Sequence, residues 1–249
     1  MSPHWGSKAP EAAAPGVGRR YNGLMSSLTL VQRLAVYALP LILALTVREM
    51  VRGRVAFRLG DTTGQQLGRL SLNPLHHIDP LGTLLLPGMM LALSSAGLGG
   101  ILIGWPKLIP IDLRKLREPR RDLGLIAVSG LAANLVMALL WGVVLKVALM
   151  QGEVEEGVWL GIRLMAVAGI TLNAGFFVLN LLPIPPFDGG RVLLSLLPAR
   201  HAVRLAAVEP YSFFILLALM VTNLISVILV PPMLLVVRLI FTVLAIDAI

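Results

Sequence analysis

The stretch Leu-Thr-Val-Arg-Glu-Met-Val-Arg-Gly-Arg, residues 45–54, places Arg48, Glu49 and Arg52 at the end of a long apolar run. At 3.6 residues per turn, positions 48 and 52 lie about 40° apart on one face of a helix, and Glu49 lies beside that face. This is the spacing of a His-Glu-x-x-His helix, in which the two His hold zinc and the Glu takes a proton from zinc-bound water. In this chain Arg occupies both His positions.

The composition around this stretch is typical of a membrane protein. Of the 249 residues, 57% are hydrophobic and 14% charged, and the mean hydropathy is +0.84; soluble domains hold roughly 45–50% apolar and 25% charged residues. A helix needs about 20 apolar residues to cross the hydrocarbon. We therefore expect an all-α integral membrane protein with about six apolar segments, at 28–47, 81–103, 123–150, 160–182, 211–230 and 231–246, the first helix continuing to about residue 59.

Two interruptions shape this expected membrane domain, which runs from residue 28 to 249 after a disordered tail at 1–27. Residues 60–80 hold no apolar run, which predicts a re-entrant or embedded element after the first helix, enclosed by protein or water. Prolines at 183, 185 and 186 predict that the fourth helix is broken. Asp188 should lie at this break, followed by a glycine turn into a short helix at 191–197.

Further blocks occur in an order that resembles the bacterial site-2 proteases, which are intramembrane zinc metallopeptidases. They are Arg-Leu-Gly-Asp at 58–61, Gly-Arg-Leu-Ser-Leu-Asn-Pro-Leu-His-His-Ile-Asp-Pro-Leu-Gly-Thr at 68–83, Gly-Trp-Pro-Lys at 104–107, Arg-Arg-Asp at 120–122, Ser-Gly-Leu-Ala-Ala-Asn at 129–134 and Asn-Leu-Leu-Pro-Ile-Pro-Pro-Phe-Asp-Gly-Gly-Arg at 180–191. With the stretch at 45–54, the resemblance covers most of the chain.

The resemblance implies where a metal site would lie. Glu49 takes the family's general-base position, and Asp188 takes the position of the third zinc ligand. The two former His ligand positions are Arg48 and Arg52, whose guanidinium groups stay protonated and have no lone pair for a metal. We expect no cofactor, with zinc only if the family activity persists. In place of a metal, we expect Arg48 or Arg52 to form an ion pair with Asp188 inside the bundle.

The resemblance also implies residues that support the site: His77, Asn134, Asn180, Gly189 and Gly190. His76 and His77 could be considered substitute zinc ligands. Adjacent positions point in different directions on a helix or a strand, however, so support of the embedded loop is the preferred role of His77.

The expected function is that of a noncatalytic pseudoprotease, which binds or scaffolds a transmembrane segment or a membrane partner. One alternative is an active intramembrane zinc metallopeptidase with unorthodox ligands. Another is a small channel or transporter, for which buried charges are the only support. The expected surroundings are the lipid bilayer and not nucleic acid, because the basic residues behind the net charge of +8 are scattered without interleaved aromatic residues.

The charge pattern bears on orientation. Basic residues crowd the loop at 104–122, which predicts that this loop lies in the cytoplasm. We also expect the N-terminus in the cytoplasm, in what would be a bacterial cytoplasmic membrane. With two crossings between the tail and this loop, four basic residues would fall on the outer side, against the usual bias: Arg52, Arg54, Arg58 and Arg69. We therefore expect residues 48–80 to stay largely within the protein and the membrane.

Overall fold

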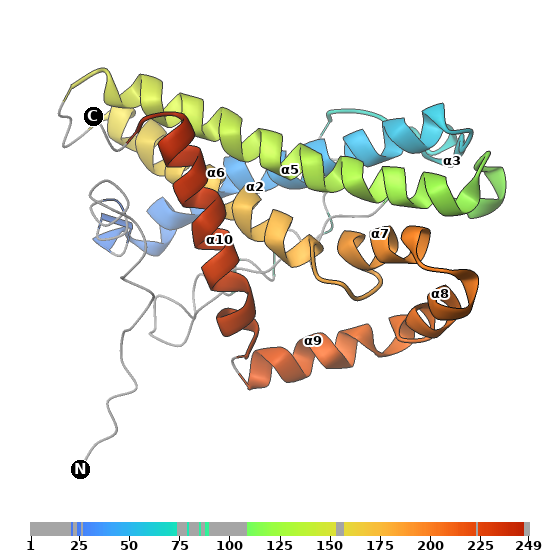
Figure 1. Ribbon diagram of the computed structural model, residues 1–249. Helices are drawn as coiled ribbons and strands as arrows, with labels where there is room; N and C mark the ends of the chain where they lie inside the picture. Colours follow the sequence, from blue (N-terminus) through green and yellow to red (C-terminus); the bar gives the residue numbers. More distant parts are fainter. Residues whose placement is uncertain are drawn as a thin grey trace, which may run out of the picture.

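The computed structural model describes residues 21, 24–25, 27–73, 79, 85, 88–89, 109–152, 157–222 and 224–246. Within them the chain is helical and forms no strand. The helices are α2 (Leu30–Arg58), α3 (Thr63–Gln66), η3 (Leu113–Lys115), α5 (Pro119–Leu149), α6 (Val158–Asn180), α7 (Asp188–Leu196), α8 (Ala199–Ala206), η4 (Glu209–Tyr211), α9 (Ser212–Val221) and α10 (Leu224–Val243) (Figure 1).

Five helical stretches among the described residues are long and apolar enough to cross a membrane: Leu30–Arg58, Pro119–Leu149, Val158–Asn180, Ala199–Val221 and Leu224–Val243. The prediction of an all-α integral membrane protein is therefore confirmed. The remaining expected segment, 81–103, lies almost entirely outside the described residues, as do residues 1–20 of the expected tail.

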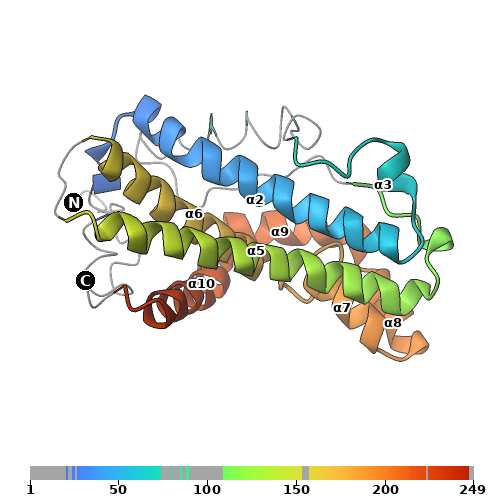
Figure 2. The same cartoon turned by 90° about the horizontal axis from the view of Figure 1, so that it is seen from above.

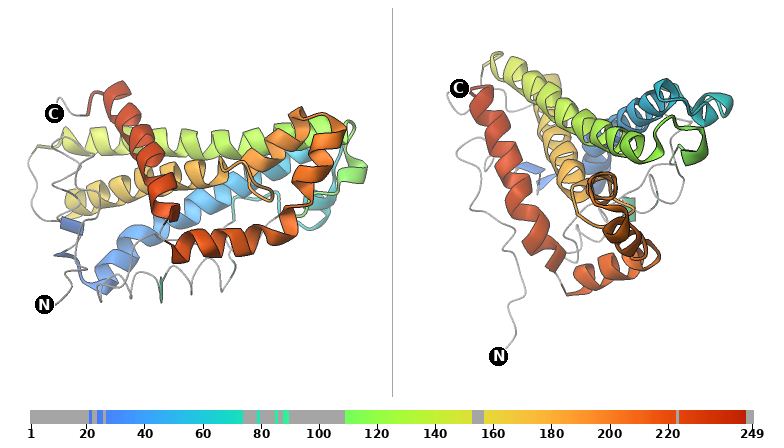
Figure 3. Two further views of the ribbon diagram at one scale, coloured as in Figure 1. Left: turned by 60° about the horizontal axis from the view of Figure 1, so that its bottom comes forward. Right: turned by 45° about the vertical axis from the view of Figure 1, so that its right-hand side comes forward.

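Helices α2, α5 and α6 run side by side as the central bundle, with α5 in contact with both of the others (Figure 2). Their buried core includes Trp141, Leu145 and Ile170. A Cβ at Gly169 would overlap the ring of Trp141, so glycine allows α6 to approach α5 closely. Helix α10 packs on α6, α9 contacts α10, and α7 packs against α5 (Figure 3).

The boundary expected between the last two segments, at Pro231, is wrong. The chain turns earlier, between α9 and α10, and Pro231 and Pro232 lie inside α10. A proline removes one helical hydrogen bond, but neighbouring helices can satisfy the freed carbonyl in a membrane bundle. Ile225 and Leu229, in the part of α10 before the two prolines, are buried against Val178 of α6. This packing holds the first half of α10 in place.

The end of α2 and the basic loop before α5 meet at one end of the bundle. The backbone N–H of Arg117 donates to the carbonyl of Leu59 at 3.1 Å. Asp61 accepts hydrogen bonds from the N–H groups of Thr63 and Asp112, both at 2.9 Å. Burial raises the pKa of Asp61, but hydrogen bonds from the side chain and backbone of Thr63 and from the backbone of Asp112, together with the charge of Lys115, outweigh it and hold the pKa below its ordinary value.

The beginning of α2 lies at the opposite end. Tyr21 and Met25, from the stretch expected to be a tail, are buried in one cluster with Leu145 and Leu164. If α2 spans a membrane, the N-terminal residues and the basic loop therefore lie on opposite sides of it. In that case only one of the two cytoplasmic predictions could be correct, and the orientation of the chain stays a prediction.

Residues after α2 fold back onto its end. Leu70 lies against Gly53, where an added Cβ would come within 2.6 Å of the Leu70 side chain, and also against Gly64 in α3. This enclosure by protein is what an embedded element requires. Its depth in the membrane stays a prediction.

Candidate functional site

Four charged side chains gather where α2 passes the break between α6 and α7. Arg48, Glu49 and Arg52 come from one face of α2, and Asp188 is the first residue of α7. Their exposed fractions are 6%, 0%, 3% and 1%. Charges are rarely buried this completely unless they are paired, so their partners determine what the site can do.

The chain after α6 folds so that Asp188 faces α2. Helix α6 ends at Asn180, and α7 begins after a proline-rich turn, which confirms the predicted break. A Cβ at Gly189 would overlap the backbone at 181–182, and a Cβ at Gly190 would overlap the backbone at 184–185. The sequence predicted that these glycines form a turn, but both lie inside α7. Their role is to let the backbone before α7 pack closely against the helix.

Arg48 connects α2 to both sides of this break. Its Nη1 donates to Oε1 of Glu49 at 2.6 Å, and its Nη2 donates to Oδ2 of Asp188 at 2.6 Å. The same Nη2 donates to Oδ1 of Asn180 at 2.8 Å. The expected ion pair to Asp188 is therefore present, and Asn180 supports it from the last turn of α6.

Arg52 completes the cluster. Its Nη1 donates to Oε1 of Glu49 at 2.9 Å, and its Nε lies 3.7 Å from Oδ1 of Asp188. Each carboxylate thus faces both guanidinium groups. Two positive and two negative charges make the Arg48–Glu49–Arg52–Asp188 cluster, called the ion-pair cluster below, neutral as a unit.

Two further contacts hold the cluster, and the one made by Ile109 was missed from the sequence. The backbone N–H of Ile109 donates to Oε2 of Glu49 at 3.2 Å, so the segment before α5 also holds the carboxylate. At Gly130 of α5, an added Cβ would lie 2.7 Å from Cδ of Arg52 and 2.8 Å from Oδ2 of Asp188. The block at 129–134 marked Gly130, but no sequence pattern marks a backbone donor.

The remaining residues predicted to support the site make no hydrogen bond to the cluster among the described residues. Asn134 is 1% exposed, and its side-chain amide has no hydrogen-bond partner among the described residues. It lies one turn beyond Gly130 on the same helix. His76 and His77 lie outside the described residues.

The donor set of this site does not fit zinc. A protein zinc site needs three or four N, O or S donors, whereas the cluster offers two carboxylates, each already bonded to guanidinium groups. In the described parts of the chain, no group of three or more His, Cys, Asp or Glu could hold a metal ion. The arrangement is suited to joining α2 to α7 electrostatically.

The fold and site define a helical membrane protein with a buried charged centre at a broken helix. The family is shown by comparison: this chain belongs to peptidase family M50, the site-2 protease family. The model of that family, described as "Peptidase family M50", matches residues 147–223, which include Asn180 and Asp188.

Bacterial relatives extend the match toward the rest of the chain. A Bacillus subtilis protein named "Putative zinc metalloprotease YwhC" is 34% identical over 192 residues, which cover 77% of this chain and 82% of the relative. "Putative zinc metalloprotease Rip2" of Mycolicibacterium smegmatis is 30% identical over 182 residues, 73% of this chain and 64% of the relative. The Rip2 protein of Mycobacterium tuberculosis H37Rv is 28% identical over 178 residues, 72% and 63% of the two chains. No solved structure matches this chain.

Proposed function

We propose that this chain is a noncatalytic member of the site-2 protease family. The observation that carries the proposal is the ion-pair cluster, in which Arg48 and Arg52 pair with Asp188 and Glu49. The family resemblance implies that these two arginines stand at former His positions. Arginine cannot bind a metal at neutral pH. Glu49, in the general-base position, bonds to two guanidinium groups and one backbone N–H, so its carboxylate is not free to take a proton from water.

The role that fits such a protein is binding. Arg48 joins α2 to α7 through Glu49 and Asp188, and we infer that this tie preserves the surface that a bundle of protease type presents to other membrane segments. The partner we propose is a transmembrane segment or another membrane protein, held without cleavage.

The orientation we propose follows from the two ends of the bundle. The end where α2 meets the basic loop carries Arg114, Lys115 and Arg117, whereas the connection from α5 to α6 contains Glu153, Glu155 and Glu156. Positive charge marks the cytoplasmic side. We therefore place the basic end in the cytoplasm and the N-terminus on the other side, in place of the cytoplasmic N-terminus expected from the sequence.

The proposal that the protein is noncatalytic can be tested by measuring its metal content. We expect the parent protein, purified in mild detergent, to hold no stoichiometric zinc by elemental mass spectrometry. The double variant Arg48→His/Arg52→His should bind about one zinc per chain, because it restores two ligands beside Asp188. Either single variant should bind little.

Two results would contradict this reasoning. About one zinc per parent chain, lost on Asp188→Asn, would show an active-type metal site with unorthodox ligands. A double variant that holds no more zinc than the parent would show that Arg48 and Arg52 do not stand at former ligand positions.

A further inference from the structure

A basic surface covers the end of the bundle away from the beginning of α2. Nine exposed basic side chains of the described residues lie there, on α2, on the 109–121 segment and on α8: Arg54, Arg58, Arg114, Lys115, Arg117, Arg120, Arg121, Arg200 and Arg204. The exposed acidic side chains nearby are Glu118 and Glu209. This excess of positive charge is a candidate surface for an anionic partner.

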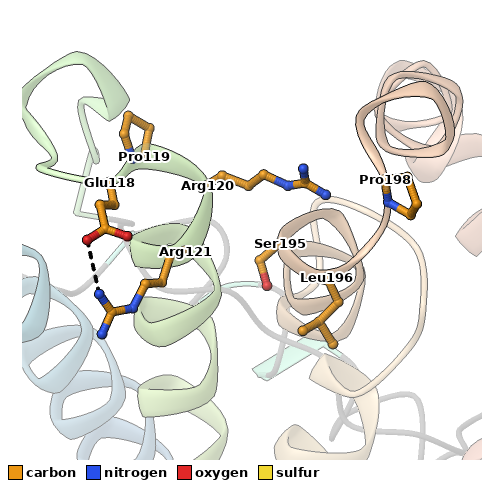
Figure 4. A pocket seen from close by; sticks show the side chains of 7 residues that line it. All are labelled: Glu118, Pro119, Arg120, Arg121, Ser195, Leu196 and Pro198. Atoms are coloured by element: carbon orange, nitrogen blue, oxygen red, sulfur yellow. Dashed lines mark hydrogen bonds and ion pairs between the residues drawn. The ribbon is translucent and has the colours of Figure 1, made fainter.

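An open pocket of about 510 Å³ interrupts this surface (Figure 4). It lies between the start of α5 and the end of α7 with its connection to α8, and it is lined by Glu118, Pro119, Arg120, Arg121, Ser195, Leu196 and Pro198. The α5 side of the wall carries two arginines and one glutamate, a net charge of +1, and the other side is apolar except for Ser195.

Arg120 carries the uncompensated charge of this pocket. Arg121 is paired with Glu118, with Nη1 and Oε1 3.1 Å apart. Nε of Arg120 donates to the carbonyl of Leu194 at 3.4 Å, and no carboxylate pairs with its guanidinium among the described residues. Asp122 is 2% exposed, and its carboxylate accepts the N–H of Glu118 at 2.9 Å, so it faces the helix terminus and not solvent.

The helix that follows the pocket is amphipathic. In α8, Arg200, His201 and Arg204 fall within an arc of about 100°, and the remaining residues are Ala, Val and Leu. No residue of α8 is buried, and Val203 is 71% exposed. Short basic helices with an uncovered apolar face lie at the boundary between lipid and water.

We infer that the pocket between α5 and the α7–α8 connection binds the phosphate of an anionic phospholipid headgroup. Arg120 contacts the phosphate, and α8 lies at the membrane surface with Arg200 and Arg204 toward neighbouring headgroups. The apolar neighbours favour a lipid over a soluble phosphate, since Leu196, on the pocket wall, and Val203 are more than 70% exposed and would meet acyl chains.

The experiment is native mass spectrometry of the full chain in mild detergent, titrated with phosphatidylglycerol or with zwitterionic phosphatidylcholine. We expect one phosphatidylglycerol to be retained in preference to phosphatidylcholine. Arg120→Gln should weaken retention about fivefold, the effect of one basic residue near a phosphate. The matched control is Arg114→Gln, which removes the same charge from the same surface outside the pocket and should change retention less than twofold.

Three outcomes would overturn the inference. Equal losses for Arg120→Gln and Arg114→Gln would mean diffuse attraction without a pocket site. Equal retention of the two lipids would mean that headgroup charge is not recognised. The third outcome is that millimolar inorganic phosphate displaces the lipid and also binds in the absence of lipid, in a way that depends on Arg120. It would mean that the ligand is a soluble phosphate. Far-UV circular dichroism of each variant checks that the exposed substitutions leave the fold intact.

Discussion

Substituting Asp188 with Asn tests whether the ion-pair cluster holds the bundle together. The carboxylate of Asp188 is 1% exposed and faces Arg48 at 2.6 Å and Arg52 at 3.7 Å. Its removal leaves Glu49 alone against two buried guanidinium groups. Stranding a buried charge in this way typically costs about 3–5 kcal/mol, and we expect Asp188→Asn to lower the free energy of unfolding by that amount.

The structure also predicts partial rescue. Arg48→Gln alone leaves the cluster one negative charge in excess, whereas Asp188→Asn/Arg48→Gln leaves the neutral pair of Arg52 and Glu49, whose atoms lie 2.9 Å apart. The double variant should therefore be more stable than the sum of the single effects predicts, by about 1–3 kcal/mol.

The chain offers a matched control for this cycle. Arg121 and Glu118 form an ion pair of similar length, 3.1 Å, with side chains that are 67% and 63% exposed. Because water screens this pair, the cycle of Arg121→Gln and Glu118→Gln should give a coupling of about 0.2–1 kcal/mol.

Both cycles can be measured by reversible unfolding in mixed micelles, followed by far-UV circular dichroism. An unchanged midpoint for Asp188→Asn, or additive effects of Asp188→Asn and Arg48→Gln, would refute the reasoning. Either result would mean that water or lipid headgroups reach the arginines and that the buried bridge does not form.

Two further predictions concern the basic end of the bundle. Because the pKa of Asp61 is lowered in the folded protein, its carboxylate contributes stability above an unfolded pKa of about 3.9, and this contribution is lost as the pH falls from about 5 through the folded pKa. The destabilisation caused by Asp61→Asn should therefore be present at pH 7 and shrink toward pH 3, and a constant difference in unfolding midpoint would contradict the linkage. The chain has no cysteine, so single cysteines can report orientation: in intact cells, a membrane-impermeant maleimide should label Gln151→Cys and not Arg114→Cys, and the opposite pattern would reverse the proposed topology.

The site could be predicted from the sequence to an unusual degree because it consists of short motifs with fixed geometry. The spacing of Arg48 and Arg52 places both on one helical face, and the prolines at 183–186 end α6 before Asp188. Family resemblance then brings the two motifs together, although 140 residues separate Arg48 from Asp188. Opposite charge at these positions is enough to predict the pair.

What the sequence could not provide are contacts that depend on packing alone. The donor to Glu49 is the backbone of Ile109, which any residue would supply equally. The meeting of Arg117 with Leu59 depends on how the chain between them folds, so hydropathy could not show that the basic loop and the N-terminal residues lie at opposite ends. The sequence just before Leu224, where α10 begins, contains no proline or glycine to mark a boundary. Pro231 and Pro232, from which the boundary was predicted, lie within α10.

Charge balance in the ion-pair cluster involves both arginines. In the arrangement that the family resemblance implies, a zinc ion balances two carboxylates and ties the first long helix to the segment after the break. Without metal, one arginine would leave one carboxylate buried and unbalanced, but Arg48 and Arg52 together restore neutrality. Arg48 also makes the tie itself, since it reaches Glu49 on its own helix and Asp188 on α7. On our proposal that these arginines stand at former ligand positions, the pair keeps the mechanical role of the metal without its chemistry. A variant with Arg48→His alone or Arg52→His alone should therefore unfold more easily than either the parent or the zinc-loaded double variant.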